Sequence, residues 1–188
     1  AFLDKFSHYR QQIDTLRNQN KAYDDAKTFA DDIKAAKQAL KDAEDTILRN
    51  IESMINSQMT RYNDFVYNQT RKAPEINLFD GTRYEFTTPD DTGTGTSYKS
   101  LIVFDLSILK LTQLPTLIHD SLIFNDIGYA PLEKIMELYT QSSKQIFIAF
   151  DKKEAPTKAI QKILDSASIL HLSSDGNELF GENWGRKK

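Results

Sequence analysis

The first 73 residues contain neither glycine nor proline, whereas all 7 glycines and all 5 prolines lie farther along the chain. Because glycine and proline interrupt helices, such a stretch favours long, unbroken helix. From Phe29 to Met54, apolar side chains return in alternating steps of four and three residues, which is the a/d seam of a coiled coil. Charged residues fill the rest of this surface, and the a positions are Ile33, Leu40, Ile47 and Met54.

A second apolar stripe over residues 6–16 precedes this seam, and its phase does not continue through residues 18–21. A turn there or a stutter in the helix accounts for the change. We therefore predict that residues 1–73 form a helical hairpin or a coiled-coil stem, whose main helix runs from about Tyr23 to about Val66. So long a helix needs a partner helix for stability, and an antiparallel pair packed on the rest of the chain is the alternative to a protruding stem. Because the helical pattern is already under way at the first residue, we expect this chain to be a segment of a longer protein.

Residues 74–188 carry a different pattern, in which short apolar strands alternate with amphipathic or buried helices. Strands that are apolar throughout and separated by helices are typical of a partly parallel sheet. We predict a second domain over residues 74–188, an α/β lobe with a partly parallel sheet, flanking helices and β-hairpins. The expected elements are a hairpin of 76–79 and 83–87, a buried helix 97–111, a strand 116–119, a helix from Pro131, a strand 145–150, a helix 156–164, and a closing hairpin of 168–172 and 178–180.

The composition excludes several classes of protein. A net charge of −3 gives no global basic field for nucleic acid, and the absence of cysteine excludes disulfide frameworks and thiolate metal sites. No apolar run approaches the roughly 18 residues that a membrane span requires, and the amino end lacks a signal-peptide pattern. We expect a cytoplasmic protein with no membrane partner. The histidines lack metal-ligand spacing, so we expect core or surface roles for His8, His119 and His171.

Two features of the second domain are suited to binding a ligand. A loop of small residues, 92–96, leads into the buried helix, and backbone N–H groups at a helix amino end attract anions. Asp120 directly follows the apolar strand 116–119, at the edge of an α/β sheet where ligands bind. From the residues alone, a flexible connection and a cap or turn residue are the commoner roles for such features.

The segments TGTSYKSLIVFDLSILKL, LPTLIHDS and KQIFIAFDK resemble the C-terminal ATPase lobe of SMC-like ABC ATPases. More narrowly, they are similar to the C-terminal domain of YydD-like proteins, a family of unknown function. The resemblance covers residues 76–180, and the helical third resembles the coil of those enzymes by architecture alone. It implies half of an ATPase head, which binds ATP and Mg²⁺ in a longer chain. The implied partners are the N-terminal lobe of the same protein, a second head in a homodimer, and DNA or an accessory protein, in DNA maintenance or phage defence.

The resemblance also implies roles for individual residues. Asp120 ends the strand that is similar to the Walker B strand, where this acid holds Mg²⁺, usually through water. Asn125 and Asp126 fall where the D-loop crosses to the other head. The residues in the place of the signature loop, which contacts the nucleotide on the other head, are Thr94, Gly95, Thr96, Ser97 and Lys99.

The sequence departs from this family pattern at three points. Ser121 stands where most relatives place the glutamate that polarises the attacking water, and serine cannot act as a general base at neutral pH unaided. Asp126 and Asp151 are the candidates to replace it, and Asp151 itself stands where many relatives carry a γ-phosphate-sensing histidine. Residues 94–99 do not reproduce the usual Ser-Gly-Gly order of the signature loop, so that assignment rests on position. The sequence also lacks a GxxxxGKS or GxxxxGKT loop to cradle phosphates, which in SMC-like chains lies at the far N-terminal end, separated from this lobe by the coiled coil. We therefore expect neither ATP hydrolysis nor tight ATP binding by this chain alone.

Two other functions remain open from the sequence. A non-catalytic module, with a coiled-coil stem for oligomerisation and a globular end that docks a partner, explains Ser121 and the missing phosphate loop without any nucleotide. In the other alternative, the carboxylates at adjacent strand ends, Asp120 and Asp151, share a metal ion and support nuclease-type chemistry.

Overall fold

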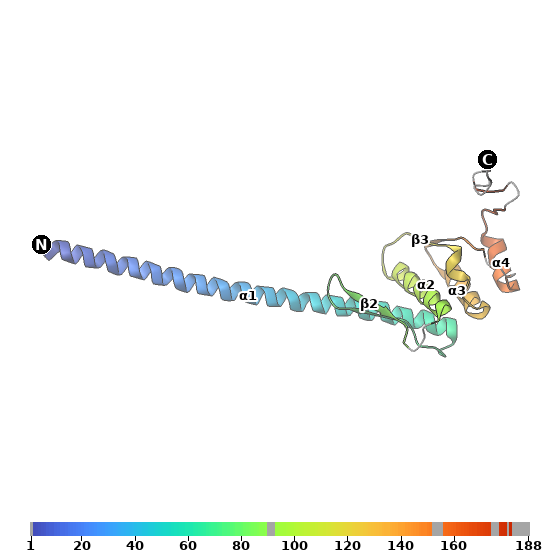
Figure 1. The fold of residues 1–188 in the computed structure, drawn as a ribbon, viewed down its shortest axis with the longest axis horizontal. Coiled ribbons are helices and arrows are strands. Elements are labelled where there is room, and N and C mark those ends of the chain that lie inside the picture. The colour runs from blue at the N-terminus through green and yellow to red at the C-terminus, as the bar shows by residue number, and fades with distance from the viewer. Residues whose placement is uncertain (1, 90–92, 152–155, 174–176, 180, 182–188) are drawn as a thin grey trace. The chain divides into compact units, whose positions relative to one another are not determined.

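The computed structural model describes the chain at residues 2–89, 93–151, 156–173, 177–179 and 181. The chain divides into two compact units, residues 1–51 with 78–84 and residues 52–77 with 85–188. Figure 1 shows its helices and strands, several of them labelled along the ribbon. They are α1 (Phe2–Tyr67), β1 (Glu75–Leu78), β2 (Tyr84–Thr87), α2 (Thr94–Leu111), β3 (Thr116–His119), the short 3-10 helix η1 (Ser121–Phe124), α3 (Tyr129–Gln141), β4 (Gln145–Ile148) and α4 (Lys158–Ala167).

Helix α1 is continuous from Phe2 to Tyr67, as the absence of glycine and proline predicts. It passes through residues 18–21 without a turn, so the predicted helical hairpin is wrong. The reason is that asparagine, glutamine and lysine at these positions shift the apolar phase but do not break a helix. In the seam, Ile33, Leu40 and Ile47 are 56%, 61% and 58% exposed. Pairing of this seam in a coiled coil stays a prediction.

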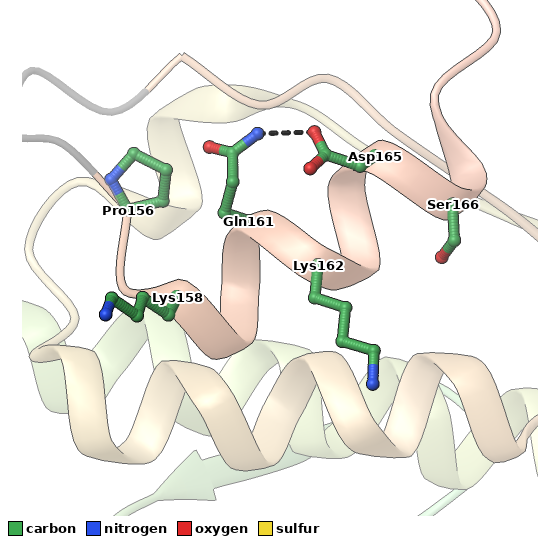
Figure 2. A pocket seen from close by; sticks show the side chains of 6 residues that line it. All are labelled: Pro156, Lys158, Gln161, Lys162, Asp165 and Ser166. Atoms are coloured by element: carbon green, nitrogen blue, oxygen red, sulfur yellow. Dashed lines mark hydrogen bonds between the residues drawn. The ribbon is translucent and has the colours of Figure 1, made fainter.

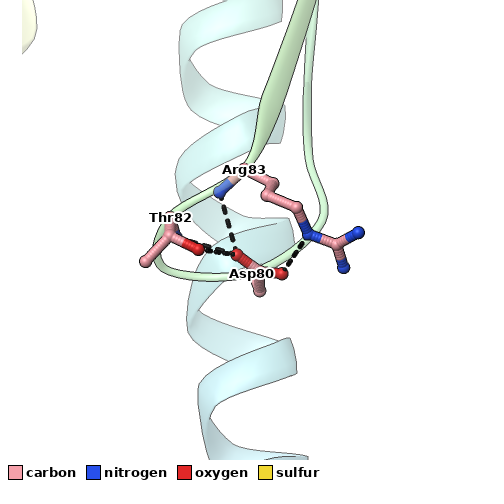
Figure 3. Close-up of polar contacts among 3 residues, drawn as sticks. All are labelled: Asp80, Thr82 and Arg83. Carbon is pink, nitrogen blue, oxygen red and sulfur yellow. Dashed lines mark hydrogen bonds and ion pairs between the residues drawn. The ribbon is translucent and has the colours of Figure 1, made fainter.

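The turn between β1 and β2 is organised by the carboxylate of Asp80 (Figure 3). Oδ1 accepts bonds from the Thr82 hydroxyl at 2.7 Å and from the Thr82 and Arg83 backbone N–H groups at 2.8 Å. Arg83 Nε donates to Oδ2 at 2.6 Å. The Thr82 hydroxyl, followed by the Arg83 side chain, lowers the pKa of the Asp80 carboxyl below its ordinary value. These bonds define the hairpin that the Asp80-Gly81 pair predicts.

Strands β3 and β4 form a parallel, two-stranded sheet whose last pair is His119 with Ile148. Strand β3 has the bounds predicted from the sequence. Strand β4 ends at Ile148 rather than at the predicted Phe150 because its partner strand ends at His119. The His119 carbonyl accepts the last hydrogen bond between the two strands, from the Ala149 N–H at 2.9 Å.

The core of the second unit lies against one face of this sheet. Leu117, Ile146 and Ile148 pack on that core, whereas Ile118 and Phe147 on the other face are 71% and 40% exposed. Period-two alternation in a strand explains this division. The fully buried helical side chains of the core include Ile102, Leu132, Ile135, Met136 and Ile160.

The two ends of the α/β lobe differ from prediction. Helix α2 begins at Thr94 rather than at Ser97, and its N-cap residue Gly93 has an extended backbone, with φ −69° and ψ 143°. The closing hairpin is wrong where the chain is described, since residues 168–172 form no strand and an isolated bridge joins Ser173 to Asn177. The expected turn residues 174–176 and the last strand residue, 180, lie outside the described ranges. Among the described residues of this segment, Ile169, Leu170 and Leu172 are exposed.

Candidate functional site

Asp120 lies at the carboxyl end of β3, where the chain turns into η1. Its backbone is extended (φ −85°, ψ 157°), and its Oδ1 caps η1 by accepting a bond from the Ser121 N–H at 2.7 Å. The Ser121 hydroxyl lies 3.4 Å from the same oxygen. Asp120 is exposed, and among the described residues Oδ2 accepts no hydrogen bond. The cap therefore orients the carboxylate and leaves one oxygen toward solvent.

The amino end of α2 carries the residues expected in the signature loop. Gly93 precedes the helix and has no side chain to cap it, and its carbonyl accepts bonds from the Ser97 N–H at 3.0 Å and the Ser97 hydroxyl at 3.3 Å. Thr94 and Ser97 are exposed, whereas Thr96 is buried. Thr94 to Ser97 thus form the first turn of a helix rather than a loop, which is the arrangement that favours anions.

Gly95 joins this turn to the segment that follows η1. A β-carbon placed on Gly95 would overlap the backbone carbonyl oxygen of Asp126 and lie 3.1 Å from the carbonyl carbon. Glycine is therefore required for the close approach of two backbones. Asn125 ends η1, and both Asn125 and Asp126 are exposed. The residues predicted for the signature turn and for the D-loop consequently lie together.

Lys99 does not lie on this surface, contrary to the sequence prediction. Its side chain is 1% exposed, and Nζ donates to Oδ1 of Asn63 at 3.0 Å and lies 5.1 Å from the centre of the Tyr67 ring. A residue five positions after Thr94 is rotated by about 140° around the helix. That rotation turns Lys99 toward α1, where it holds two elements of the unit together.

Asp151 lies beyond β4, on the same edge of the sheet as Asp120. The parallel pairing of His119 with Ile148 sets this relationship, since each aspartate follows its own strand within three residues. Asp151 is exposed. Within the described ranges, no group of three or more histidine, aspartate or glutamate side chains could hold a metal ion.

A buried polar chain, which the sequence prediction missed, lies behind Asp120. His119 is 5% exposed, with Nδ1 2.7 Å from the Tyr139 hydroxyl and Nε2 3.1 Å from Oδ2 of Asp105. Burial, and next the charge of Asp105, raises the pKa of Tyr139 above its ordinary value. The signal available in the sequence was Asp105 itself, which is the one acid in helix α2.

Hollows on the described part of the second unit include two that are lined by no predicted site residue. One, of about 570 Å³, lies between α1, α2 and the end of α3. The positively charged side chains that line it are those of Arg61, Lys110 and Lys144. Lys144 Nζ donates to the carbonyls of Leu109 and Thr112, so it caps the end of α2. The other, of about 540 Å³, runs along α4 and is shown in Figure 2.

Comparison with known proteins gives a family and a fold. A family model described as "Uncharacterised protein conserved in bacteria (DUF2326)" matches residues 62–184. No curated protein matches the chain. A solved chain, described as "Structural biochemistry of ATP-driven dimerization and DNA stimulated activation of SMC ATPases", is similar with a TM-score of 0.52 and 13% identity, over 71% of this chain and 84% of that chain. At this identity the likeness is one of fold. In the described part of the chain, no helix has both the length and the apolar character that a bilayer crossing requires.

Proposed function

The chain belongs to the DUF2326 family of uncharacterised bacterial proteins, and from this premise we propose that it is the C-terminal lobe of an SMC-like ABC ATPase head of the YydD-like type. In this proposal it supplies a signature-type turn and a Walker B strand to heads that dimerise on ATP and Mg²⁺. The partners are the N-terminal lobe of the same protein and a second head, with a role in DNA maintenance or phage defence. The contact between Gly95 and Asp126 is the observation that carries the proposal.

This contact supports a composite nucleotide surface. It brings a helix amino end with exposed Thr94 and Ser97 hydroxyls against the exposed Asn125–Asp126 segment. Helix amino ends favour the negative charge of a phosphate, and the Thr94 hydroxyl adds a donor, whereas the Ser97 hydroxyl donates to the Gly93 carbonyl. Because these groups face solvent, they are suited to a nucleotide that is bound on another lobe.

Asp120 is the proposed holder of Mg²⁺. Its carboxylate is exposed, and one oxygen is oriented by the Ser121 N–H. A single protein carboxylate together with substrate phosphates is a common way to bind Mg²⁺. Ser121 supplies no base, so the proposal leaves activation of the attacking water to Asp126 or Asp151, both of which are exposed.

The uncovered face of the β3–β4 sheet supports a second lobe. Ile118 and Phe147 are 71% and 40% exposed on that face, and Leu122 of η1 is 64% exposed. Parallel sheets are normally covered on both faces, and two strands alone make a small sheet. An N-terminal lobe that extends and covers this sheet would bury these side chains.

ATP-dependent dimerisation of the longer protein, with both lobes present, tests the proposal. Light scattering with and without Mg²⁺–ATP should show a nucleotide-dependent increase in mass, and Asp120→Asn should abolish ATP turnover. Leu114→Ala, which changes an exposed side chain before β3, is the matched control and should leave turnover unchanged. Unchanged turnover in Asp120→Asn would remove Asp120 from its role. Calorimetry showing that this chain alone binds ATP at about 1 µM or tighter would contradict the proposed division of the site.

The exposed seam of α1 favours one alternative, a non-catalytic oligomerisation module. Ile33, Leu40 and Ile47 present an apolar stripe that another helix can cover without any nucleotide. In that case the same light-scattering measurement should show a mass that is independent of Mg²⁺–ATP.

A further inference from the structure

Tyr139 of α3 contacts both ends of the segment that carries Asp120. Its hydroxyl lies 2.7 Å from Nδ1 of His119, the residue immediately before Asp120. Its ring packs edge-on against the ring of Phe124, the last residue of η1, with centroids 6.4 Å apart. One buried side chain therefore holds residues 120–124 from the two sides.

With a neutral His119 ring, the hydrogen bonds run in one consistent direction. The Asp105 carboxylate only accepts, so Nε2 of His119 carries the proton that it donates across 3.1 Å. In a neutral imidazole the other nitrogen then accepts, and the Tyr139 hydroxyl donates to it. The chain Tyr139 to His119 to Asp105 thus ties α3 and α2 to the last residue of β3.

The surroundings of Tyr139 suit a fixed donor rather than a nucleophile. Its side chain is buried, and burial raises the pKa of its hydroxyl, so the proton stays on oxygen at neutral pH. A buried phenol with a satisfied hydrogen bond orders its neighbours, because breaking the bond leaves a polar group unpaired.

The ring contacts of Tyr139 and Phe124 extend to Phe150, the residue before Asp151. The ring of Phe124 lies 5.8 Å, centroid to centroid, from the ring of Phe150, which directly precedes Asp151. Phe124 therefore joins the two segments that leave the sheet edge, since its ring contacts both Tyr139 and Phe150.

We propose that Tyr139 is a positioning residue, which sets the orientation of Asp120 and Ser121 through His119 and Phe124. The structural claim, that Tyr139 orders residues 120–124, concerns this chain alone. The functional claim, that Tyr139 affects ATP turnover, rests on the function proposed above.

Backbone amide exchange in this chain tests the structural part. Tyr139→Phe keeps the ring on Phe124 and removes the hydroxyl, so amides of residues 120–124 should exchange about threefold to tenfold faster, while those of residues 132–136 change little. Tyr62→Phe is the control, since it removes the hydroxyl of a less buried tyrosine on α1, whose side-chain partner is Gln58 rather than His119. His119→Gln, which can still donate and accept, should change exchange less than His119→Ala. An equal increase throughout the core, or none at residues 120–124, would overturn the proposal.

Turnover in the longer protein tests the functional part. Tyr139→Phe should lower kcat by about tenfold or more with KM for ATP within about twofold, because misplaced groups slow chemistry without weakening binding. An unchanged kcat beside an active wild type would overturn the positioning role. A wild type without turnover would instead count against the proposed function, and the exchange measurement would still decide whether Tyr139 orders residues 120–124.

Discussion

Gly95 in the first turn of α2 lies against the backbone carbonyl of Asp126, so closely that only a hydrogen side chain fits between them. This contact joins two segments that lie far apart in the sequence, and it explains why glycine stands inside a helix, where it is usually unfavourable. The atom that a β-carbon would meet belongs to the backbone, which cannot move aside as a flexible side chain can.

Gly95→Ala should therefore destabilise the protein by about 1–2 kcal/mol, because the overlap with Asp126 outweighs the helix propensity that alanine adds. Urea unfolding measures this change. Gly81→Ala is the control, since a β-carbon on Gly81 meets nothing within 4 Å, and we expect a change of about 0.5 kcal/mol or less. Equal stability of the two variants would show that the Gly95–Asp126 contact is not as close as described.

Lys99→Ala should lower stability by about 1–3 kcal/mol, because it leaves Oδ1 of buried Asn63 without this donor. Lys162→Ala, an exposed change in α4, should cost about 0.5 kcal/mol or less in the same unfolding experiment. A surface role for Lys99 in nucleotide binding would give the opposite pattern, with normal stability and weaker ATP-dependent dimerisation.

Tyr139 should make stability fall at alkaline pH. Its pKa in the folded state lies above the ordinary 10.0, so the folded protein keeps a proton that the unfolded chain releases. The contribution of the protonated Tyr139 hydroxyl to the free energy of unfolding is fully present below pH 10.0. It is lost as the pH rises further, at up to about 1.4 kcal/mol per pH unit.

Unfolding of Tyr139→Phe between about pH 9 and pH 11.5 should show a shallower decline than the wild type. Burial also raises the pKa of Tyr62, so part of the slope should persist in this variant. A slope identical to that of the wild type would contradict the burial of the Tyr139 hydroxyl.

Asp80 should titrate below its ordinary range. Thr82→Val removes the hydroxyl that lowers its pKa most, and should raise that pKa toward 3.8. Because the folded pKa is depressed, the contribution of Asp80 to the turn is present at neutral pH and is lost as the pH falls below 3.8 toward the folded value. A carbon-detected NMR titration of the Asp80 carboxyl measures the shift, and Thr87→Val in β2 should leave it unchanged.

Much of the fold was predictable from local sequence. The apolar run between Pro115 and Asp120 defines β3 at the predicted residues, and the Asp80-Gly81 pair predicts the hairpin. These signals are local, because turn chemistry and strand propensity depend on near neighbours. The predicted hairpin after residue 168 failed, since a strand also needs a partner that no local pattern guarantees.

In the candidate site, too, some features were predictable from local sequence and others depended on tertiary packing. The position of Asp120 after a strand follows from the sequence, whereas the burial of Lys99 depends on where α2 begins and on which face meets α1. His119 was expected in the core or on the surface, but its links to Asp105 and Tyr139 join residues from three elements. Such links depend on helix packing, which the sequence pattern does not specify.

The sequence by itself determined that the first third is long helix, that a strand ends just before Asp120, and that a carboxylate and a small-residue turn are present in the second unit, because these depend on local propensity and spacing. Only the tertiary structure decided that Gly95 meets Asp126, that Lys99 faces Asn63, and that Tyr139 holds both ends of residues 120–124. The physical reason is that these are contacts between elements, and their geometry is set by how apolar faces pack rather than by the order of residues along any one element.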